Sequence, residues 1–240
     1  ERLAGVEAVE AVHGRSAYAR SVSAHGDRLY FRQFLSGRDF GVADQLAQQM
    51  VNFVYAIGDR QTGECVLVDP AYDPAALVDA VAADGMRVVG ALASHYHADH
   101  IGGSIFGHDI AGIAQLLEHA DVPIHVQADE VPWIERSAGV GSGHLMAHAS
   151  GDVLAVGELT IELIHTPGHT PGSQCFLVHD PAGGKLVSGD TLFLDGCGRT
   201  DLPGSDPAQM LASLRRLHRV PDEVVLYPGH RYSPADSAPM

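Results

Sequence analysis

The most constraining feature of the sequence is a cluster of imidazole and carboxylate side chains directly after a predicted buried strand. That strand covers residues 87–93, where apolar and β-branched residues predominate. The next positions carry three histidines and one aspartate, in the order His95, Tyr96, His97, Ala98, Asp99 and His100. At this chain's residue frequencies, such a pattern arises by chance in about one chain in 200. A metal site at the end of a strand is therefore predicted.

The spacing within the cluster indicates two neighbouring metal sites. In an extended segment, residues i and i+2 point the same way, so His95 and His97 can bind one ion from one side. Asp99 and His100 lie beyond the bend and can face a second ion. Mixed nitrogen and oxygen ligands suit Zn²⁺, Fe²⁺ or Mn²⁺, and the motif has no cysteine that would complete a closed structural site. An open coordination position is expected.

The composition narrows the class of protein and its partners. The 240 residues, 45% of them hydrophobic, suffice to bury a large core. A formal net charge of −15, from 30 acidic and 15 basic residues, disfavours nucleic acid as a partner. Bound divalent cations would offset part of this charge. No feature of the sequence indicates the oligomeric state.

Cysteine usage and hydropathy bear on the compartment. Three cysteines, at positions 65, 175 and 197, make a disulfide framework unexpected and favour a reducing compartment. No run of about 18 apolar residues is present that could span a membrane. The first twenty residues carry acidic side chains at positions 1, 7 and 10, where a secretion signal needs a basic start and an apolar run. A cytoplasmic protein with no membrane partner is expected.

The order of secondary-structure patterns predicts the fold class. Residues 1–27 have no sustained period and are expected to form a loosely packed lead-in, whereas residues 28–240 are expected to form a single domain. Strand patterns occupy residues 29–35, 51–57, 65–68, 87–93, 123–126, 153–164 (as a hairpin), 174–178, 185–187 and 224–226. Helical patterns occupy residues 73–84, 112–120, 129–136 and 207–218. This order predicts an α+β fold of two β-sheets packed face to face with helices outside.

Four motifs in a fixed order carry a resemblance to a known family. They are Ala93–Gly103, His165–Ser173, Ser188–Phe193 and Tyr227–His230, and each follows a predicted strand. The chain resembles the metallo-β-lactamase-fold hydrolases over roughly residues 28–234. The resemblance implies the αββα sandwich of that family.

The resemblance also implies a set of metal ligands. It assigns His95, His97 and His169 to a first metal ion. It assigns Asp99, His100 and His230 to a second ion, with Asp190 bridging the two. Zinc is the favoured metal, with iron and manganese as alternatives.

Two further stretches bear on the branch of the family. True β-lactamases have Cys or Ser where Asp190 stands, so Asp190 favours the glyoxalase II-like side. Residues 195–204 are similar to a stretch shared by glyoxalase II-like thioesterases and persulfide dioxygenases, which implies a small thiol-derived substrate. The alternative for this stretch is a tight glycine-rich turn in which Arg199 pairs with Asp201 and Cys197 is buried. Only ten residues follow His230, so no counterpart of the helical C-terminal part of glyoxalase II is expected, and glutathione as the thiol carrier stays open.

Two enzymatic activities are compatible with these features. The first is a binuclear hydrolase, similar to hydroxyacylglutathione hydrolase, in which a hydroxide held between two metal ions attacks a thioester or related acyl carbon. In it Asp99 orients the hydroxide and Asp190 sets the spacing of the ions. The alternative is a mononuclear Fe(II) persulfide dioxygenase with His95, His169 and Asp190 as ligands. A complete set of ligands disfavours a third, non-enzymatic metal-binding role.

The stretch from Ser104 to Val122 is longer than in many members of the family. An outer helix with a surface loop is the simpler expectation for it, and a lid that shapes the acyl pocket is the alternative.

Overall fold

The computed structural model describes residues 28–105, 107–180 and 183–240. The lead-in expected for residues 1–27 lies outside this part of the chain. The expectation that residues 28–240 form one domain stays a prediction. Among the described residues, every helix is too short or too polar to cross a membrane.

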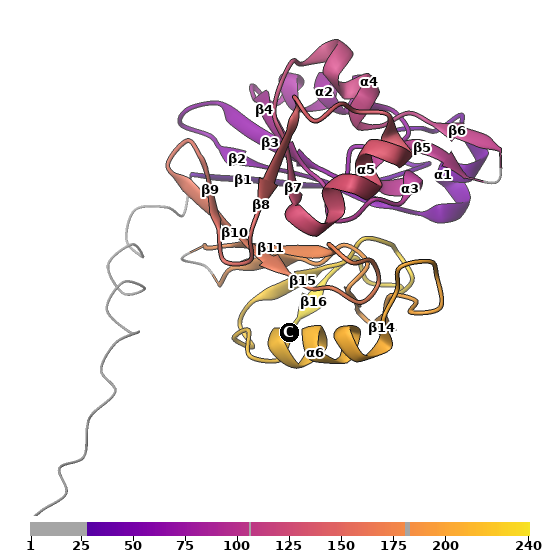
Figure 1. Ribbon diagram of the computed structural model, residues 1–240. Coiled ribbons are helices and arrows are strands. Elements are labelled where there is room, and N and C mark those ends of the chain that lie inside the picture. Colours follow the sequence, from indigo (N-terminus) through magenta and orange to yellow (C-terminus); the bar gives the residue numbers. More distant parts are fainter. Residues whose placement is uncertain (1–27, 106, 181–182) are drawn as a thin grey trace, which may run out of the picture.

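Two six-stranded sheets lie face to face, and helices cover their outer faces (Figure 1). The first sheet has the order β1 (Leu29–Leu35), β2 (Phe53–Asp59), β3 (Glu64–Val68), β4 (Arg87–Leu92), β7 (Ile124–Gln127) and β8 (Leu145–His148). The second has the order β16 (Ala238–Pro239), β15 (Val225–Tyr227), β12 (Lys185–Val187), β11 (Gln174–Val178), β10 (Leu159–His165) and β9 (Val153–Val156). The αββα sandwich expected from the sequence is confirmed.

Helices lie on both outer faces. Five are on the side of the first sheet: α1 (Gln45–Met50), α2 (Pro74–Ala83), α3 (Ala98–Ile101), α4 (Ile113–His119) and α5 (Val131–Ala138). On the second sheet packs α6 (Pro207–Leu217). Two short hairpins complete the described elements: β5 (Gly103–Ile105) with β6 (His108–Ile110), and β13 (Leu192–Phe193) with β14 (Gly196–Cys197).

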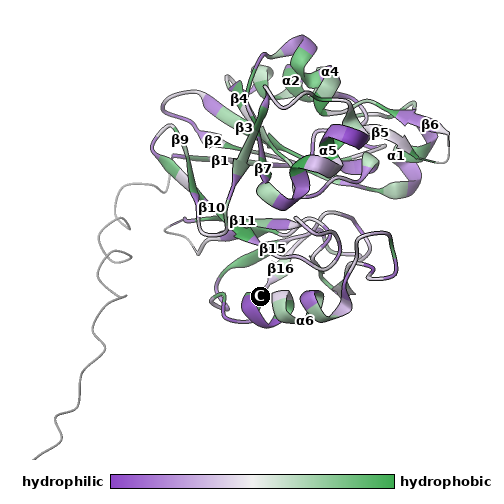
Figure 2. Cartoon of the chain, viewed as in Figure 1, coloured by the Kyte–Doolittle hydropathy of each residue, from purple (hydrophilic) through white to green (hydrophobic). Residues whose placement is uncertain are grey.

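Alternation of side chains along the strands fills three apolar layers. In β3, Cys65 and Leu67 face the helices of the first sheet, while Val66 and Val68 face the second sheet. In β11, Phe176 points into the layer between the sheets, and its neighbour Cys175 faces α6. This follows from the two-residue period of a strand, because both faces of each sheet are covered. Figure 2 shows the resulting hydrophobic colour along the central strands.

Several predicted elements form close to their expected bounds because their local signals are strong. Asp73 caps α2 by accepting from the Ala76 N–H, with Pro74 in the first turn. Asp206 and Pro207 begin α6 in the same way. The opening strands β1, β2 and β3 form the antiparallel arrangement that their turns predict.

Other elements differ from the prediction. The strand expected from residue 51 begins at Phe53, because Val51 has a left-handed backbone with φ of 49°. The helix expected at 129–136 begins as a 3-10 turn over Ala128–Glu130 and continues as α5. Helices α1 and α3, strand β8, strand β16 and both short hairpins were not predicted. They are two to six residues long, too short for a period to be visible.

Away from the predicted metal site, His125 provides a test of stability against pH. Its Nδ1 lies 2.9 Å from Nε2 of His148, and burial, followed by the charge of His148, lowers its pKa to about 4. The unfolded chain therefore takes up this proton near pH 6.5, before the folded chain does, and stability falls as pH drops from about 6.5 to about 4. Between pH 7 and pH 5 we expect the parent to lose about 2 kcal/mol more unfolding free energy than His125→Gln. Urea unfolding of both proteins at the two pH values measures the difference, and parallel losses would contradict the assignment.

Candidate metal centre

All seven predicted ligands lie on loops or short helices that follow strand ends. His95, His97, Asp99 and His100 follow β4, and the other three follow β10, β12 and β15. Strand β12 is parallel to β15, and both run in the same direction as β10 because β11 is antiparallel to β10 and to β12. Their carboxyl ends therefore meet at one edge of the second sheet, beside the end of β4. This topology brings residues up to 135 positions apart in the chain, His95 and His230, into one site.

The first group of side chains consists of three histidines. The Nε2 atoms of His95 and His169 each lie 3.0 Å from Nδ1 of His97. One ring nitrogen carries either a single hydrogen or a single lone pair, so it cannot form good hydrogen bonds to both neighbours. A tetrahedral ion bound by three imidazoles would hold their nitrogens about 3.3 Å apart. The observed arrangement therefore fits a shared cation.

The second group contains Asp99, His100 and His230. Nε2 of His100 lies 3.1 Å from Nε2 of His230, and the Oδ2 atom of Asp99 lies 3.5 Å and 3.4 Å from these two nitrogens. All three side chains are buried, with at most 5% of the residue exposed. Three potential ligand atoms thus converge on one point, as in the first group.

Asp190 lies between the two groups. Its Oδ2 is 3.6 Å from Nε2 of His169 in the first group and 3.4 Å from Nε2 of His230 in the second. Its Oδ1 is buried and accepts no hydrogen bond within the described residues. A buried carboxylate oxygen without a donor is costly unless a cation satisfies it. The position suits a carboxylate that contacts two ions.

Hydrogen bonds on the far side of three rings fix the tautomers. Nδ1 of His169 donates to the Arg199 carbonyl at 2.9 Å, and Nδ1 of His230 donates to the Met50 carbonyl at 2.7 Å. Nδ1 of His100 lies 3.0 Å from the Asp69 carboxylate. When these rings are neutral, the single ring hydrogen is on Nδ1 and faces the acceptor. The lone pair of Nε2 then faces the metal centre. Two such lone pairs 3.1 Å apart, on His100 and His230, need a cation or a proton between them.

The electrostatics of the site agree with a bound cation. Burial and the neighbouring imidazoles of His100 and His97 hold the pKa of His95 well below its usual value. Burial alone would lower the pKa of His100, but the carboxylates of Asp190, Asp99 and Asp69 raise it to about 10. The metal-free protein therefore keeps a proton on His100 that a divalent ion would displace.

Three residues that the sequence analysis did not identify support the second group. The Asn52 side-chain amide donates to Asp99 at 3.0 Å, and the Tyr72 hydroxyl donates to the Asn52 carbonyl oxygen at 3.0 Å. Asp69 accepts from the Ser94 hydroxyl as well as contacting His100. Asp69 could have been identified, because it directly follows β3, a parallel neighbour of β4, and parallel strands end at the same edge. Asn52 and Tyr72 carry no comparable local signal.

Backbone strain is concentrated around this second group. Val51, Asp69 and Tyr72 have positive φ values of 49°, 54° and 66°. A β-branched residue such as Val51 rarely adopts this conformation. It stands between Met50 and Asn52, which contact His230 and Asp99. Such strain is typical of functional sites, where surrounding contacts hold an unfavourable backbone in place.

The stretch at residues 195–204 contacts the centre through its backbone. Arg199 forms the expected paired contact with Asp201, with two distances of 2.9 Å, while its carbonyl fixes His169. Gly198 allows this approach, since a Cβ there would lie 1.9 Å from the Asp190 carbonyl oxygen. The alternative for this stretch, in which Cys197 is buried, is wrong on that point: Cys197 is exposed, because both residues of β14 face solvent.

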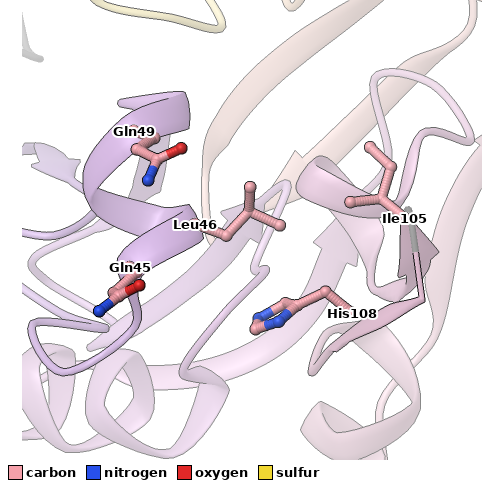
Figure 3. A pocket seen from close by; sticks show the side chains of 5 residues that line it. All are labelled: Gln45, Leu46, Gln49, Ile105 and His108. Atoms are coloured by element: carbon pink, nitrogen blue, oxygen red, sulfur yellow. The ribbon is translucent and has the colours of Figure 1, made fainter.

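The stretch from residue 104 to 122 contains most of the β5–β6 hairpin as well as helix α4. A pocket of about 220 Å³ lies between this hairpin and α1, and its lining is Gln45, Leu46, Gln49, Ile105 and His108 (Figure 3). His108 also lies 3.5 Å from the Asp44 carboxylate. The hairpin directly follows α3, and α1 directly precedes Met50 and Asn52. Both walls of the pocket are therefore continuous with segments that hold the second group.

Most of the predicted ligands are shielded from solvent. Of the seven predicted ligands, only His97 and Asp190 are partly exposed. Aromatic rings lie beside the ligands: Tyr96 contacts His97 and stacks on Trp133, while Tyr232 stacks on His230 at 4.8 Å. Tyr96, Trp133 and Tyr232 therefore form an aromatic rim beside the two ligand groups.

Comparison with known proteins places the chain in a family. Residues 49–230 match the model of the Metallo-beta-lactamase superfamily, which spans all four motifs. The chain belongs to this superfamily.

Individual relatives point to one part of the superfamily. The chain is 32% identical over 186 residues to a hydroxyacylglutathione hydrolase of Synechococcus, covering 76% of this chain and 65% of that protein. It is 30% identical to the probable polyketide biosynthesis zinc-dependent hydrolase BaeB of Bacillus velezensis, covering 77% and 75%. The structure of ETHE1 from Myxococcus xanthus superimposes with a TM-score of 0.68 at 27% identity, covering 88% of this chain and 79% of that one. The resemblance to the glyoxalase II-like branch is confirmed.

Proposed function

We propose that this protein is a metal-dependent hydrolase that binds two divalent ions and cleaves a small thioester or related acyl substrate. The observation that carries the proposal is the pair of ligand groups, one of three histidines and one of Asp99, His100 and His230, with Asp190 between them. When bound, two divalent ions supply a nucleophilic hydroxide at neutral pH and stabilise the developing charge on the acyl oxygen.

The chain's own residues then orient the reaction. Asp99, fixed by the Asn52 amide, presents a carboxylate that accepts a hydrogen bond from the nucleophile. Asp190 fixes the separation of the two groups. The aromatic rim beside His97 and His230 binds the organic part of the substrate and excludes water. A thiolate is a good leaving group, so no strong protein acid is needed.

The names of the relatives support a thiol-derived substrate and zinc. Hydroxyacylglutathione hydrolases act on a glutathione thioester by name, and the Bacillus relative is named as zinc-dependent. We therefore favour zinc, with iron or manganese as alternatives. A small acyl-thiol is favoured as the substrate.

A mononuclear iron dioxygenase acting on a persulfide is the competing function. Its three ligands would be His95, His169 and Asp190, which also lie together in the structure. The second group speaks against it, because a buried carboxylate and two buried imidazoles converge there without being needed as ligands of one iron.

Thioester hydrolysis tests the proposal directly. We expect thiol release from several small acyl thioesters by the zinc-loaded protein, and absent or slow opening of a chromogenic β-lactam. Removal of the metal with a chelator should abolish thiol release, and addition of zinc should restore it. A clear preference for the β-lactam, or thiol release that persists without metal, would contradict the proposal.

A further inference from the structure

Glu130 is a buried carboxylate with no part in the proposed chemistry. It ends the 3-10 turn before α5 and is 0% exposed. Its Oε1 accepts from the Tyr96 N–H at 2.8 Å and from the Thr170 hydroxyl at 2.7 Å. Its Oε2 accepts from the Gly172 N–H at 2.6 Å. Both oxygens of one buried side chain are thus used.

The three donors belong to the two segments that carry the first ligand group. Tyr96 stands between His95 and His97, and Thr170 follows His169. The two segments lie more than 70 positions apart in the chain. One carboxylate therefore ties together the backbones that present all three histidines.

Glu130 is unusual in its charge as well as in its burial. Burial raises its pKa to about 7, although the hydrogen bonds from Thr170, Tyr96 and Gly172 lower it. Within the described residues it forms no ion pair with an arginine or lysine. A buried carboxylate without a cationic partner is costly, and the three donors are what stabilise its charged form. If this position served packing alone, an apolar residue would fill it with a smaller desolvation penalty than a glutamate.

The loop at Gly172 is closely fitted to this side chain. A Cβ at Gly172 would lie 2.5 Å from the Glu130 backbone nitrogen and 2.7 Å from its Oε2. Glycine is therefore required for the backbone N–H to reach the carboxylate. Since all three partners are donors, a glutamine amide at position 130 would place one of its own N–H groups against a donor.

We propose that Glu130 is a positioning residue that sets the geometry of the three-histidine group by holding its two backbone segments at a fixed separation. The proposal rests on the proposed function only in that a metal ion binds between these histidines. It predicts that Glu130 controls the metal affinity of this group and leaves that of the Asp99, His100 and His230 group nearly unchanged.

Metal binding to the apoprotein tests this without an activity assay. Zinc titration against a chromophoric chelator gives stepwise binding constants, and His97→Ala identifies the constant that belongs to the three-histidine group. We expect Glu130→Gln to weaken that constant about 10- to 100-fold, as loss of a residue that orients ligands does, and to change the other less than about 3-fold. The absorption spectrum of cobalt(II)-substituted Glu130→Gln should differ from that of the parent in the bands of the three-histidine group. Glu135→Gln, which makes the same change at an exposed position of α5, should bind zinc like the parent.

The outcomes separate the inference from the proposed function. Unchanged affinity of the three-histidine group in folded Glu130→Gln, or an equal weakening of both groups, would overturn the role of Glu130. A parent protein that binds no zinc would instead overturn the proposed function. If circular dichroism shows that Glu130→Gln does not fold, Thr170→Val removes one of the three donors, and a weakening of about 3- to 10-fold confined to the same group is then expected. No weakening in Thr170→Val would also overturn the inference.

Discussion

Replacement of His230 by alanine is expected to reduce the metal content from two ions per chain to one and to lower thioester turnover by more than about 100-fold. Nε2 of His230 faces His100, Asp99 and Asp190 within 3.4 Å, so its loss leaves the second group without one of its ligand atoms. Elemental analysis and thiol-release kinetics on the same preparation measure both effects.

This substitution separates the two candidate enzymes. In the mononuclear iron dioxygenase, His230 only orients neighbours, and its loss would cost about 10- to 100-fold at most. His218→Ala, an exposed histidine at the end of α6, is the matched control and should behave like the parent. If His230→Ala retains full metal content and most activity while His169→Ala loses both, the binuclear assignment is wrong. One iron and no zinc in fully loaded parent protein would lead to the same conclusion.

Replacement of Asp190 by asparagine is expected to weaken both ligand groups at once. The substitution keeps the shape of the side chain but removes the charge that lies between His169 and His230. We expect metal loss from both groups, and a loss of turnover beyond about 100-fold, since one carboxylate serves two ions. Zinc titration distinguishes the two variants: both zinc-binding constants should weaken in Asp190→Asn, whereas only one should be lost in His230→Ala.

Asp222→Asn provides the control for Asp190→Asn because it makes the same change at an exposed residue of a turn. Circular dichroism must accompany both measurements, since the loss of this buried carboxylate also removes one of the negative charges that face His100 and His230. Two tightly bound ions in folded Asp190→Asn would contradict its bridging position.

Four of the predicted ligands were accessible to sequence analysis because their motif is local. His95, His97, Asp99 and His100 stand within six positions, and their spacing alone indicates two sites. The same holds for elements whose signals are local: Asp73 with Pro74 starts α2, and the continuous apolar runs of β3 and β11 are typical of strands with both faces covered. Assignment of His169, Asp190 and His230 needed the resemblance to a family, because no spacing connects them.

The sequence by itself determined the class of chemistry, the order of the longer elements and the strand ends at which the predicted ligands stand. Only the tertiary structure decided which groups hold those ligands in place. Asn52 reaches Asp99 across 47 positions and Glu130 reaches Tyr96 across 34, and neither residue differs in type or spacing from an ordinary polar residue of a loop or turn. Their roles depend on burial and on the direction of individual hydrogen bonds, which arise when separate segments pack together and leave no pattern along the chain.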